Sequence, residues 1–352
     1  MPDGYEQISS KWMDGHGPDG EIVLSSRVRL ARNINNMSFP YLAPDSQTEE
    51  VQKQVKSIYE QKNRDFADFA FFQVKDVLPL QRQVLIEKHL ISPLLVREPH
   101  NSAVLMRQDE AVIIMINEED HLRIQCLLPG LQLEQALQEA MSYDDLLERE
   151  LDYAFDENWG YLTVCPTNVG TGLRASVMVH LPALVLTKQI NRVLAAIAQV
   201  GLAVRGLYGE GSEMVGNLVQ ISNQITLGQS EVEIVRNLYS VTKQVIEQEF
   251  QARQLLLNEG RERLADRVNR ALGILRYARV LSSQEAMQLL SDVRLGIDSG
   301  LIDEVDGSVM KELMVMLQPA CLQVWTGKEL DGLERDMERA RLINKRLGAG
   351  KV

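Results

Sequence analysis

Residues 103–128, AVLMRQDEAVIIMINEEDHLRIQCLL, are the strongest indication of the fold class. It contains three short segments rich in Val, Ile and Leu, at 103–107, 111–116 and 122–128, which is the composition and length of buried strands. Gln108, Asp109 and Glu110 separate the first two segments, and three residues suit a hairpin loop. We therefore predict neighbouring strands here, with a polar turn at 117–121 before the third.

The segments on either side extend this prediction. Strand patterns occur at 21–24, 161–164 and 174–180, and helix patterns at 48–61, 79–91, 131–152 and 182–200. The strands come in adjacent groups instead of alternating strictly with helices. This order favours an α+β fold, a mostly antiparallel sheet flanked by helices, over a doubly wound α/β fold.

From about residue 229 onwards the sequence patterns are helical. Ser230 and Glu233 form a capping-box pattern that opens an amphipathic helix, and Ser282 with Glu285 opens another. Further helical patterns run to the C-terminus without convincing strands. We predict a first domain over 1–250 and an all-α bundle over 251–352, with the boundary at 245–260. The apolar positions of this bundle suit a core that also forms a dimer contact: Met310, Leu313, Met314 and Leu317.

Length and composition exclude several classes of function. The 352 residues are enough for about two domains, and a formal net charge of −12 argues against nucleic-acid binding. We expect a cytoplasmic protein, because we find no secretory signal, no membrane span and no CxxC pair among Cys126, Cys165 and Cys321. Residues 109–157 hold 14 Asp or Glu against two Arg. This segment is either a solvated acidic surface or one that attracts cationic substrates.

Two motifs place charged side chains in the predicted sheet. In Ser25-Ser-Arg-Val-Arg29, the two arginines are two residues apart, so on an extended chain they lie on one face and suit a polyphosphate. In Asn117-Glu-Glu-Asp-His-Leu-Arg123, three acids stand between two strands beside a His and an Arg. Each motif has a plain alternative: surface arginines in the first, a solvated turn in the second.

Two later motifs combine glycine with arginine. Cys165-Pro-Thr-Asn-Val-Gly-Thr-Gly-Leu-Arg174 is a turn whose backbone N–H groups suit an anion, and its cysteine is either a reactive thiol or a packed core residue. Val204-Arg-Gly-Leu-Tyr-Gly-Glu-Gly211 reads as a loop that covers a ligand, or as an ordinary flexible loop. No Walker A or protein-kinase motif is present, so phosphate chemistry here needs another design.

In this order, the four motifs resemble those of the phosphagen (guanidino) kinase family. The resemblance covers roughly residues 20–240 and implies an antiparallel sheet flanked by helices. It also implies transfer of the γ-phosphoryl group of ATP to a guanidinium, with Mg²⁺ held mainly by phosphates and water and no protein metal ligand named. ATP would be bound by the arginines of the motifs and two neighbours: Arg27, Arg29, Arg123, Arg174, Arg205, Ser25 and His121.

The resemblance assigns the chemistry to three residues. Glu119 would orient the guanidinium and accept its proton, Glu210 would hold its other side, and Cys165 would pack against it as a thiolate. One position departs from the family. Met178 stands where creatine- and arginine-kinase relatives carry a nucleotide-contacting His, while His180 faces the same way by strand alternation.

The ends of the chain resemble a bacterial branch of this family, the protein-arginine kinases of the McsB type. Only 24 residues precede Ser25, where other phosphagen kinases carry a helical domain, and about 100 residues follow that those enzymes lack. In this branch the acceptor is an Arg side chain of a protein. The alternatives are a kinase acting on free arginine and a phosphoarginine reader with weak catalysis.

A last motif supports this branch. Arg335, Asp336, Arg339 and Ala340 form an RDxxRA pattern on a predicted helix, with the two arginines at i and i+4 on one face. It is either a salt-bridged surface or, as the resemblance implies, an allosteric phosphoarginine-binding site. The implied partners are a stress transcriptional repressor, damaged proteins, a zinc-binding activator adaptor, a Clp-type unfoldase–protease and a second copy of the chain, with no nucleic acid and no membrane.

Overall fold

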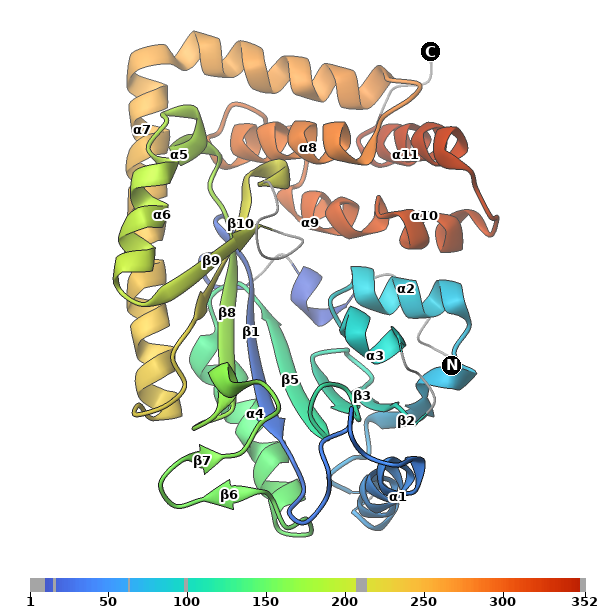
Figure 1. Ribbon diagram of the computed structural model, residues 1–352. Helices are drawn as coiled ribbons and strands as arrows, with labels where there is room; N and C mark the ends of the chain where they lie inside the picture. Colours follow the sequence, from blue (N-terminus) through green and yellow to red (C-terminus); the bar gives the residue numbers. More distant parts are fainter. Residues whose placement is uncertain (1–9, 15–16, 63, 98–100, 207–213, 349–352) are drawn as a thin grey trace.

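A twisted sheet of eight strands forms the centre of the molecule in the computed structural model, which describes residues 10–14, 17–62, 64–97, 101–206 and 214–348 (Figure 1). The strand order is β2-β3-β4-β5-β1-β8-β10-β9, and every neighbouring pair is antiparallel. The antiparallel sheet predicted from the sequence is thereby confirmed. The strands are β1 (Val23–Arg32), β2 (Phe69–Gln73), β3 (Ala103–Arg107), β4 (Val112–Ile116), β5 (Leu122–Pro129), β8 (Leu173–His180), β9 (Leu202–Gly206) and β10 (Leu218–Asn223).

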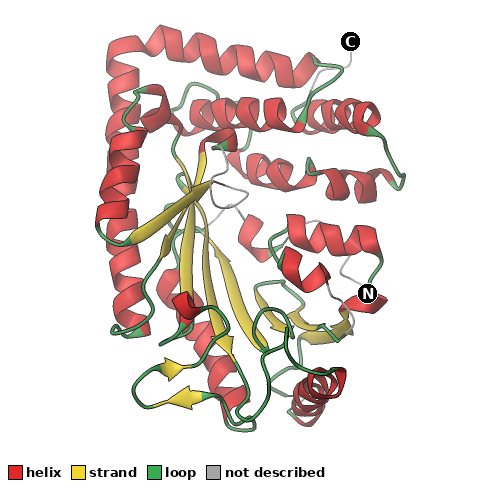
Figure 2. Cartoon of the chain, in the orientation of Figure 1, coloured by secondary structure: helices red, strands yellow, loops and turns green. Residues whose placement is uncertain are grey.

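Helices cover the two faces of this sheet differently (Figure 2). On one face, α1 (Asp45–Gln61), α4 (Leu133–Glu148) and the first half of α7 (Glu231–Tyr277) share a continuous apolar core with the sheet, which includes Val28 and Leu30 of β1. On the other face, α2 (Pro79–Glu87) and α3 (Pro93–Arg97) pack against β2, β3 and β4 at one side of the sheet, through Phe72, Val104 and Ile113 among others. The middle of that second face is therefore left for polar side chains.

The C-terminal helices form a second core beyond one end of the strands. It is built from α8 (Ser283–Asp298), α9 (Gly307–Met316), α10 (Pro319–Thr326), α11 (Gly332–Arg346) and the second half of α7, as Figure 1 shows. Helix α7 belongs to both cores, because Ala252 packs in the first and Leu264 in the second. The predicted boundary at 245–260 thus lies inside one long helix, whose helical geometry is interrupted at Gly260. Met310, Leu313, Met314 and Leu317 are all buried in the second core.

Several local predictions need correction. The strand predicted at 161–164 shrinks to β7 (Gly160–Tyr161), paired with β6 (Phe155–Asp156), because the Val164 N–H donates to the carboxylate of Asp120 instead of to a neighbouring strand. The helix predicted at 182–200 is divided into α5 (Pro182–Leu186) and α6 (Ile190–Gln199). Between them Lys188 has φ of 60°, which does not continue a right-handed helix. None of the described helices is long and apolar enough to span a membrane.

Candidate active site

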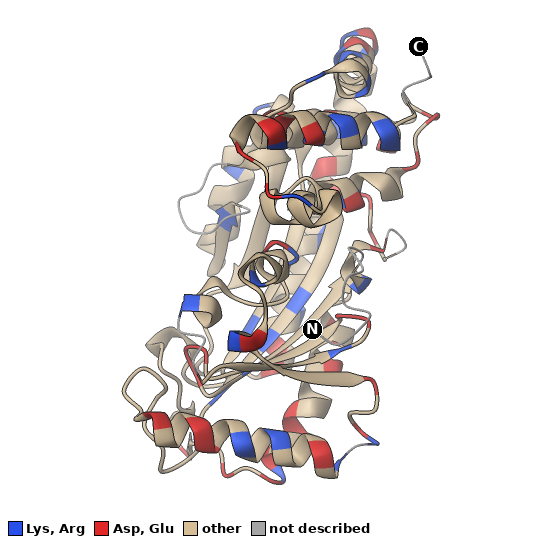
Figure 3. Cartoon of the chain, turned by 90° about the vertical axis from the view of Figure 1, so that its right-hand side faces the viewer, with Lys and Arg blue, Asp and Glu red and all other residues tan. Residues whose placement is uncertain are grey.

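Five arginines converge on the face of the sheet that α2 and α3 leave open. Arg27 and Arg29 project from β1 with the predicted period of two, and Arg29 stands directly opposite Arg174 of β8. Arg123 comes from β5 and Arg205 from β9. All five are half-buried, and we call this set the arginine face. Figure 3 shows basic positions along the strands in the middle of the molecule.

The electrostatics of the arginine face favour an anionic ligand. Burial, together with the nearby charge of Arg123, lowers the pKa of Arg27 to about 10. Burial also lowers the pKa of Arg29 well below its ordinary value, with further contributions from Arg27, Arg123 and Arg174. Arg29 Nε is buried and has no hydrogen-bond partner among the described residues. A phosphate chain would relieve this repulsion and accept the unsatisfied donors.

The acids of residues 118–120 have three different environments. Arg123 donates to Glu118 at 2.8 Å and to Glu119 at 2.9 Å. The side chain of Glu118 is 1 % exposed and that of Glu119 is 32 % exposed. Asp120 is fully buried and accepts hydrogen bonds from Asn33 and from the backbone of Val164. Of the three carboxylates, Glu119 is therefore the one that a substrate can reach.

A cavity of about 600 Å³ brings the predicted residues together. It is lined by four members of the arginine face, Glu119, Cys165 and the loop that follows this cysteine: Arg29, Arg123, Arg174, Arg205, Thr167, Asn168 and Gly172, among others. Cys165 Sγ lies 3.0 Å from the hydroxyl of Thr167. Glu210, the third predicted catalytic residue, lies outside the described residues.

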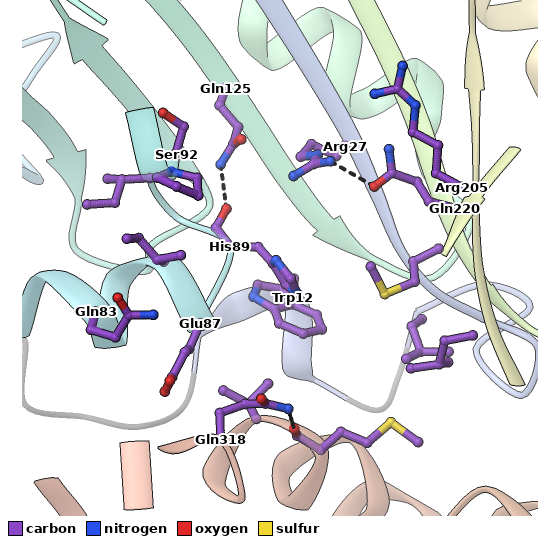
Figure 4. A pocket seen from close by; sticks show the side chains of 18 of the residues that line it. Trp12, Arg27, Gln83, Glu87, His89, Ser92, Gln125, Arg205, Gln220 and Gln318 are labelled. Atoms are coloured by element: carbon purple, nitrogen blue, oxygen red, sulfur yellow. Dashed lines mark hydrogen bonds between the residues drawn. The ribbon is translucent and has the colours of Figure 1, made fainter. Parts of the chain in front are cut away.

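A second cavity of about 740 Å³ continues from the arginine face towards the C-terminal helices. It shares Arg29, Arg123 and Arg205 with the first cavity and adds Arg27, which donates to Gln220 at 3.0 Å. Figure 4 shows Arg27, Arg205 and Gln220 on the sheet, facing Trp12, Glu87 and Gln318 across the cavity. The apolar part of the lining comes from both halves of the molecule, with Leu24, Met178 and Leu218 from the sheet and Met287, Met314 and Val315 from the C-terminal helices.

The C-terminal helices contribute residues to this cavity that sequence reasoning missed. Lys311 of α9 lines it, is almost fully buried, and has no partner for its ammonium among the described residues. Glu87 of α2 accepts the backbone N–H groups of Ala320 and Cys321 at 2.8–3.0 Å, and so joins α2 to the N-terminus of α10 across the cavity. No local motif marks these residues, because each acts across a contact between distant segments.

Two residues predicted to bind ATP, His121 and Ser25, line neither cavity. His121 is fully buried; its Nδ1 accepts the Ile34 N–H at 3.1 Å, and its Nε2 is 3.0 Å from the Ser38 carbonyl oxygen. It lines neither cavity and instead fixes the chain that follows β1, and burial lowers its pKa to about 4. Ser25 is buried on β1 opposite Met178, on the side of Arg27 but outside both cavity linings.

Met178 and His180 also differ in surroundings. Met178 lines the larger cavity, whereas His180 is fully buried and its Nε2 lies 2.7 Å from the hydroxyl of Ser291 on α8. By strand alternation His180 lies on the same side of β8 as Met178, but α8 covers that end of the sheet, so His180 does not line the larger cavity. His180 joins the sheet to the C-terminal helices.

The glycine turn after Cys165 does not present the N–H groups that the sequence suggested. The Gly170 N–H donates to the carbonyl of Tyr161, and the Gly172 N–H donates to that of Asn168. A Cβ at Gly160 would come within 2.5 Å of the Gly170 carbonyl oxygen, so these two glycines let two loops pack backbone against backbone. The turn shapes the cavity wall, while the arginines supply its donors.

Several acids of the segment 109–157 are paired with basic residues from outside it. Asp109 and Glu139 pair with Arg107, Glu110 pairs with the buried Lys88, and Asp144 pairs with the buried Arg32. The exposed acids without an ion pair among described residues are Glu134 and, towards the C-terminal end, Asp145, Glu148, Asp152 and Glu157. The segment is therefore not one continuous acidic surface.

The RDxxRA residues differ among themselves. Arg339 is buried on α11, where it donates to the carbonyls of Leu281 and Leu317 and pairs with Asp336. Ala340 is buried too, while Arg335 and Asp336 are half-buried. The two arginines do not form a shared accessible face as the i, i+4 spacing suggested. No group of three or more His, Cys, Asp or Glu side chains suited to a metal ion occurs in the described parts of the chain.

Comparison with known families accounts for both halves of the chain. Residues 50–252 match the family model of the ATP:guanido phosphotransferase C-terminal catalytic domain. Residues 261–351 match that of the protein-arginine kinase McsB C-terminal domain. The first match ends and the second begins within helix α7, with residues 253–260 between them.

Individual proteins agree with the family models. The chain is 55 % identical to a protein-arginine kinase of Halothermothrix orenii over 338 residues, 96 % of each chain. It is also 55 % identical to a protein-arginine kinase of Brevibacillus brevis over 339 residues, 96 % of this chain and 95 % of the relative. Among solved structures, a lombricine kinase superposes with a TM-score of 0.58 at 24 % identity, covering 72 % of each chain, which shows a shared fold.

Proposed function

The chain belongs to the family of protein-arginine kinases, phosphotransferases that act on a guanidino group, and we propose that it transfers the γ-phosphoryl group of ATP to Arg side chains of proteins. The observation that carries the mechanism is the cavity in which four arginines, Glu119 and Cys165 meet. A strong positive field beside an accessible carboxylate suits a phosphate donor and a cationic acceptor.

The arginine face binds the phosphates in this proposal. Phosphoryl transfer depends chiefly on positioning and on neutralising charge as the phosphoryl group moves. Arg29, Arg123 and Arg205 line both cavities, so they would hold the γ-phosphoryl group between donor and acceptor. Arg27 and the larger cavity would take the rest of the nucleotide. Mg²⁺ would be held by phosphate oxygens and water, which is its usual environment, and would supply further charge neutralisation.

Glu119 would prepare the acceptor. A guanidinium carries its positive charge at neutral pH and has no free lone pair, so it must lose a proton as it attacks. One Glu119 oxygen bonds to Arg123, which leaves the other oxygen for the substrate guanidinium. The nitrogen forms a bond to the γ-phosphorus, the bond from that phosphorus to the β–γ bridging oxygen breaks, and the proton passes to Glu119. The products are phosphoarginine and ADP.

Cys165 and Glu210 complete the acceptor site by resemblance to the family. Cys165 would pack beside the guanidinium as a thiolate and adjust its electrostatics, without a covalent intermediate. Glu210 would hold the other side of the guanidinium. Orientation by such groups contributes on the order of 7–11 kcal/mol in favourable cases, so positioning would count for more than basicity.

The C-terminal helices would bind phosphoarginine as an allosteric signal. Arg335 and Asp336 are the accessible members of the RDxxRA pattern, and Arg339 is placed to hold Asp336 in position. Ala340 would shape the site from within the core. Helix α11 does not line the larger cavity itself, but Arg339 donates to the carbonyls of Leu281 and Leu317, which lie close before α8 and α10. Residues of α8 and α9 and the start of α10 line the larger cavity, which gives a route by which the site would influence ATP binding.

The wider role rests on the family resemblance. We propose a cytoplasmic homodimer that marks damaged proteins for a Clp-type unfoldase–protease and inactivates a stress repressor, under control of a zinc-binding activator adaptor. Two alternatives differ in chemistry: a kinase for free arginine, and a phosphoarginine reader with weak catalysis. Retention of five arginines, Glu119 and Cys165 around connected cavities favours catalysis.

³¹P NMR of the purified protein with ATP and Mg²⁺ tests the proposal, with free L-arginine and a basic protein offered in parallel. We expect a phosphoramidate signal with the protein substrate only. A signal with free arginine would assign the small-substrate reaction, and silence in both samples would contradict kinase activity of the isolated chain. Glu119→Gln serves as the negative control, with Asp145→Asn, an exposed acid outside both cavities, as its matched control.

A further inference from the structure

An exposed aromatic groove lies near the 600 Å³ cavity that contains Glu119 and Cys165. The β6–β7 hairpin projects at the lower left of Figure 1, and its Phe155 and Trp159 are 57 % and 56 % exposed. Leu227, from the chain between β10 and α7, is 44 % exposed and faces the same groove. The groove has a volume of about 420 Å³. Large apolar side chains gathered at one exposed place commonly mark a binding surface.

The hairpin is held in a fixed conformation. The Tyr161 ring lies between Arg32, whose Cζ is 3.5 Å from the ring centroid, and Phe155, whose ring centroid is 5.2 Å away. Arg32 itself is buried and paired with Asp144. The carboxylate of Asp156 accepts the N–H groups of residues 158 and 159, which fixes the turn. An aromatic surface fixed in advance loses little entropy when it binds.

One loop, residues 165–172, borders both the groove and the active site. Gly170 and Thr171 line the groove, while Cys165, Thr167, Asn168 and Gly172 line the 600 Å³ cavity that holds Glu119. Tyr161 and Cys165 are four residues apart, so their Cα atoms are separated by at most about 14 Å. An extended polypeptide advances roughly 3.3 Å per residue. A chain that places an arginine at Cys165 would therefore bring residues three to five positions away onto the groove.

The charge of the groove also suits the polypeptide on either side of a substrate arginine. Its described lining includes Glu231 and no Lys or Arg. Glu157 is exposed in the hairpin turn, and Glu148 is exposed beside Tyr161, whose hydroxyl donates to it. These acids form no ion pair with described residues, unlike Asp109, Glu110, Glu139 and Asp144. A basic, apolar segment complements this surface better than an acidic one.

We propose that this groove binds the polypeptide that flanks the target arginine, taking an extended segment with apolar and basic side chains three to five residues away. The inference rests on the proposed function, because it assigns a substrate subsite to that reaction. It also gives the kinase a preference for unfolded segments, in which apolar residues are exposed together with arginine.

Two peptides with one arginine each test the proposal, one with Leu and Lys three to five residues from the arginine and one with Ser at those positions. Trp159→Ala and Phe155→Ala should each raise KM for the first peptide about ten-fold, a common effect of truncating an aromatic contact residue. They should leave kcat, KM for ATP and KM for the Ser peptide unchanged. Trp159→Phe should restore most of the affinity, and Tyr277→Ala, an exposed aromatic on α7 far from the groove, should change nothing.

Binding without ATP separates the outcomes. Anisotropy of the labelled Leu/Lys peptide should show the same ten-fold loss in Trp159→Ala, with the far-UV spectrum and melting temperature of wild type. Equal affinity in wild type and variant would overturn the groove proposal while leaving the kinase proposal intact. Absence of phosphoramidate with wild type would overturn the kinase proposal instead. If Trp159→Ala abolishes self-association in sedimentation without changing peptide KM, the groove joins two copies of the chain and the proposal is wrong.

Discussion

Two groups of arginines, both predicted from sequence motifs, have opposite environments in this molecule. On the arginine face, Arg29 is crowded by Arg27, Arg123 and Arg174, and its Nε has no hydrogen-bond partner among described residues. On α11, Arg339 donates to two backbone carbonyls and pairs with Asp336. Around Arg29 like charges repel one another, whereas Arg339 has its acceptors built in.

The difference shows how to separate ligand-binding arginines from structural ones. Repulsion among like charges in the unliganded protein costs stability, and a bound anion recovers it. An arginine whose donors are satisfied by carbonyls gains nothing further from a ligand, but its removal leaves those carbonyls unpaired. Activity should therefore depend on the first group and stability on the second.

Arg29→Gln gives the largest expected effect. Phosphoryl transfer should fall by about 10³-fold, the lower end of what a transition-state arginine contributes. The unliganded protein should melt at the same temperature or higher, because the substitution relieves repulsion from its arginine neighbours. Steady-state rates and thermal unfolding measure both, with the exposed Arg192→Gln as control. A lower melting temperature with little loss of rate would place Arg29 with the structural arginines.

Glu119→Gln tests the acid that sits on the arginine face. The amide keeps the shape and still accepts a hydrogen bond from Arg123, but it takes up no proton. We expect kcat to fall by about 10²- to 10³-fold, within the range for a general base. KM for ATP should change little, as measured by coupled assay at saturating protein substrate. A rate near that of wild type would mean that orientation alone activates the guanidinium and that Glu119 is not the base.

Sequence patterns predicted the features that depend on local periodicity, namely the strands and which side chains share a strand face. The apolar runs of 103–128 gave β3, β4 and β5 nearly to the residue. The spacing of Arg27 and Arg29 placed both side chains on one face of a strand, because that alternation is local. The family resemblance, and not the spacing, brought in Arg123, Arg174 and Arg205, which come from three other strands.

The rest depended on contacts that no local pattern contains. Helical spacing put Arg335 and Arg339 on one side of α11, but it could not say that this side meets the carbonyls of Leu281 and Leu317. His121 lies inside a family motif and yet holds the chain after β1. The role of Glu87 arises where α2 and α10 meet, more than 200 residues apart in the chain.

Arg339→Leu should show the structural side of the comparison. The substitution removes the donors to the carbonyls of Leu281 and Leu317 and leaves Asp336 without its partner. We expect a loss of about 3 kcal/mol in the free energy of unfolding, because two buried carbonyls lose their donor, measured by urea denaturation. Arg341→Leu is the matched control on the same helix, since Arg341 is exposed and makes a surface pair with Glu338, and should change stability by less than about 0.5 kcal/mol. Equal stability of the two variants would refute the structural role.

His121→Gln gives the smallest effect and tests whether this motif residue belongs with the ligands or with the framework. Burial holds the pKa of His121 at about 4, below its unfolded value near 6.5, so the folded protein favours the neutral ring. The stability from this group is complete above pH 6.5 and is lost as the pH falls towards 4, by about 2 kcal/mol between pH 6.5 and pH 5. Urea unfolding at those two pH values should show that the variant loses less free energy of unfolding than wild type. The buried His180 is present in both proteins and contributes equally to the loss in each. KM for ATP at pH 7.5 should be unchanged, because both ring nitrogens face backbone groups of residues 34 and 38. An unchanged pH dependence together with a raised KM for ATP would instead move His121 to the nucleotide site.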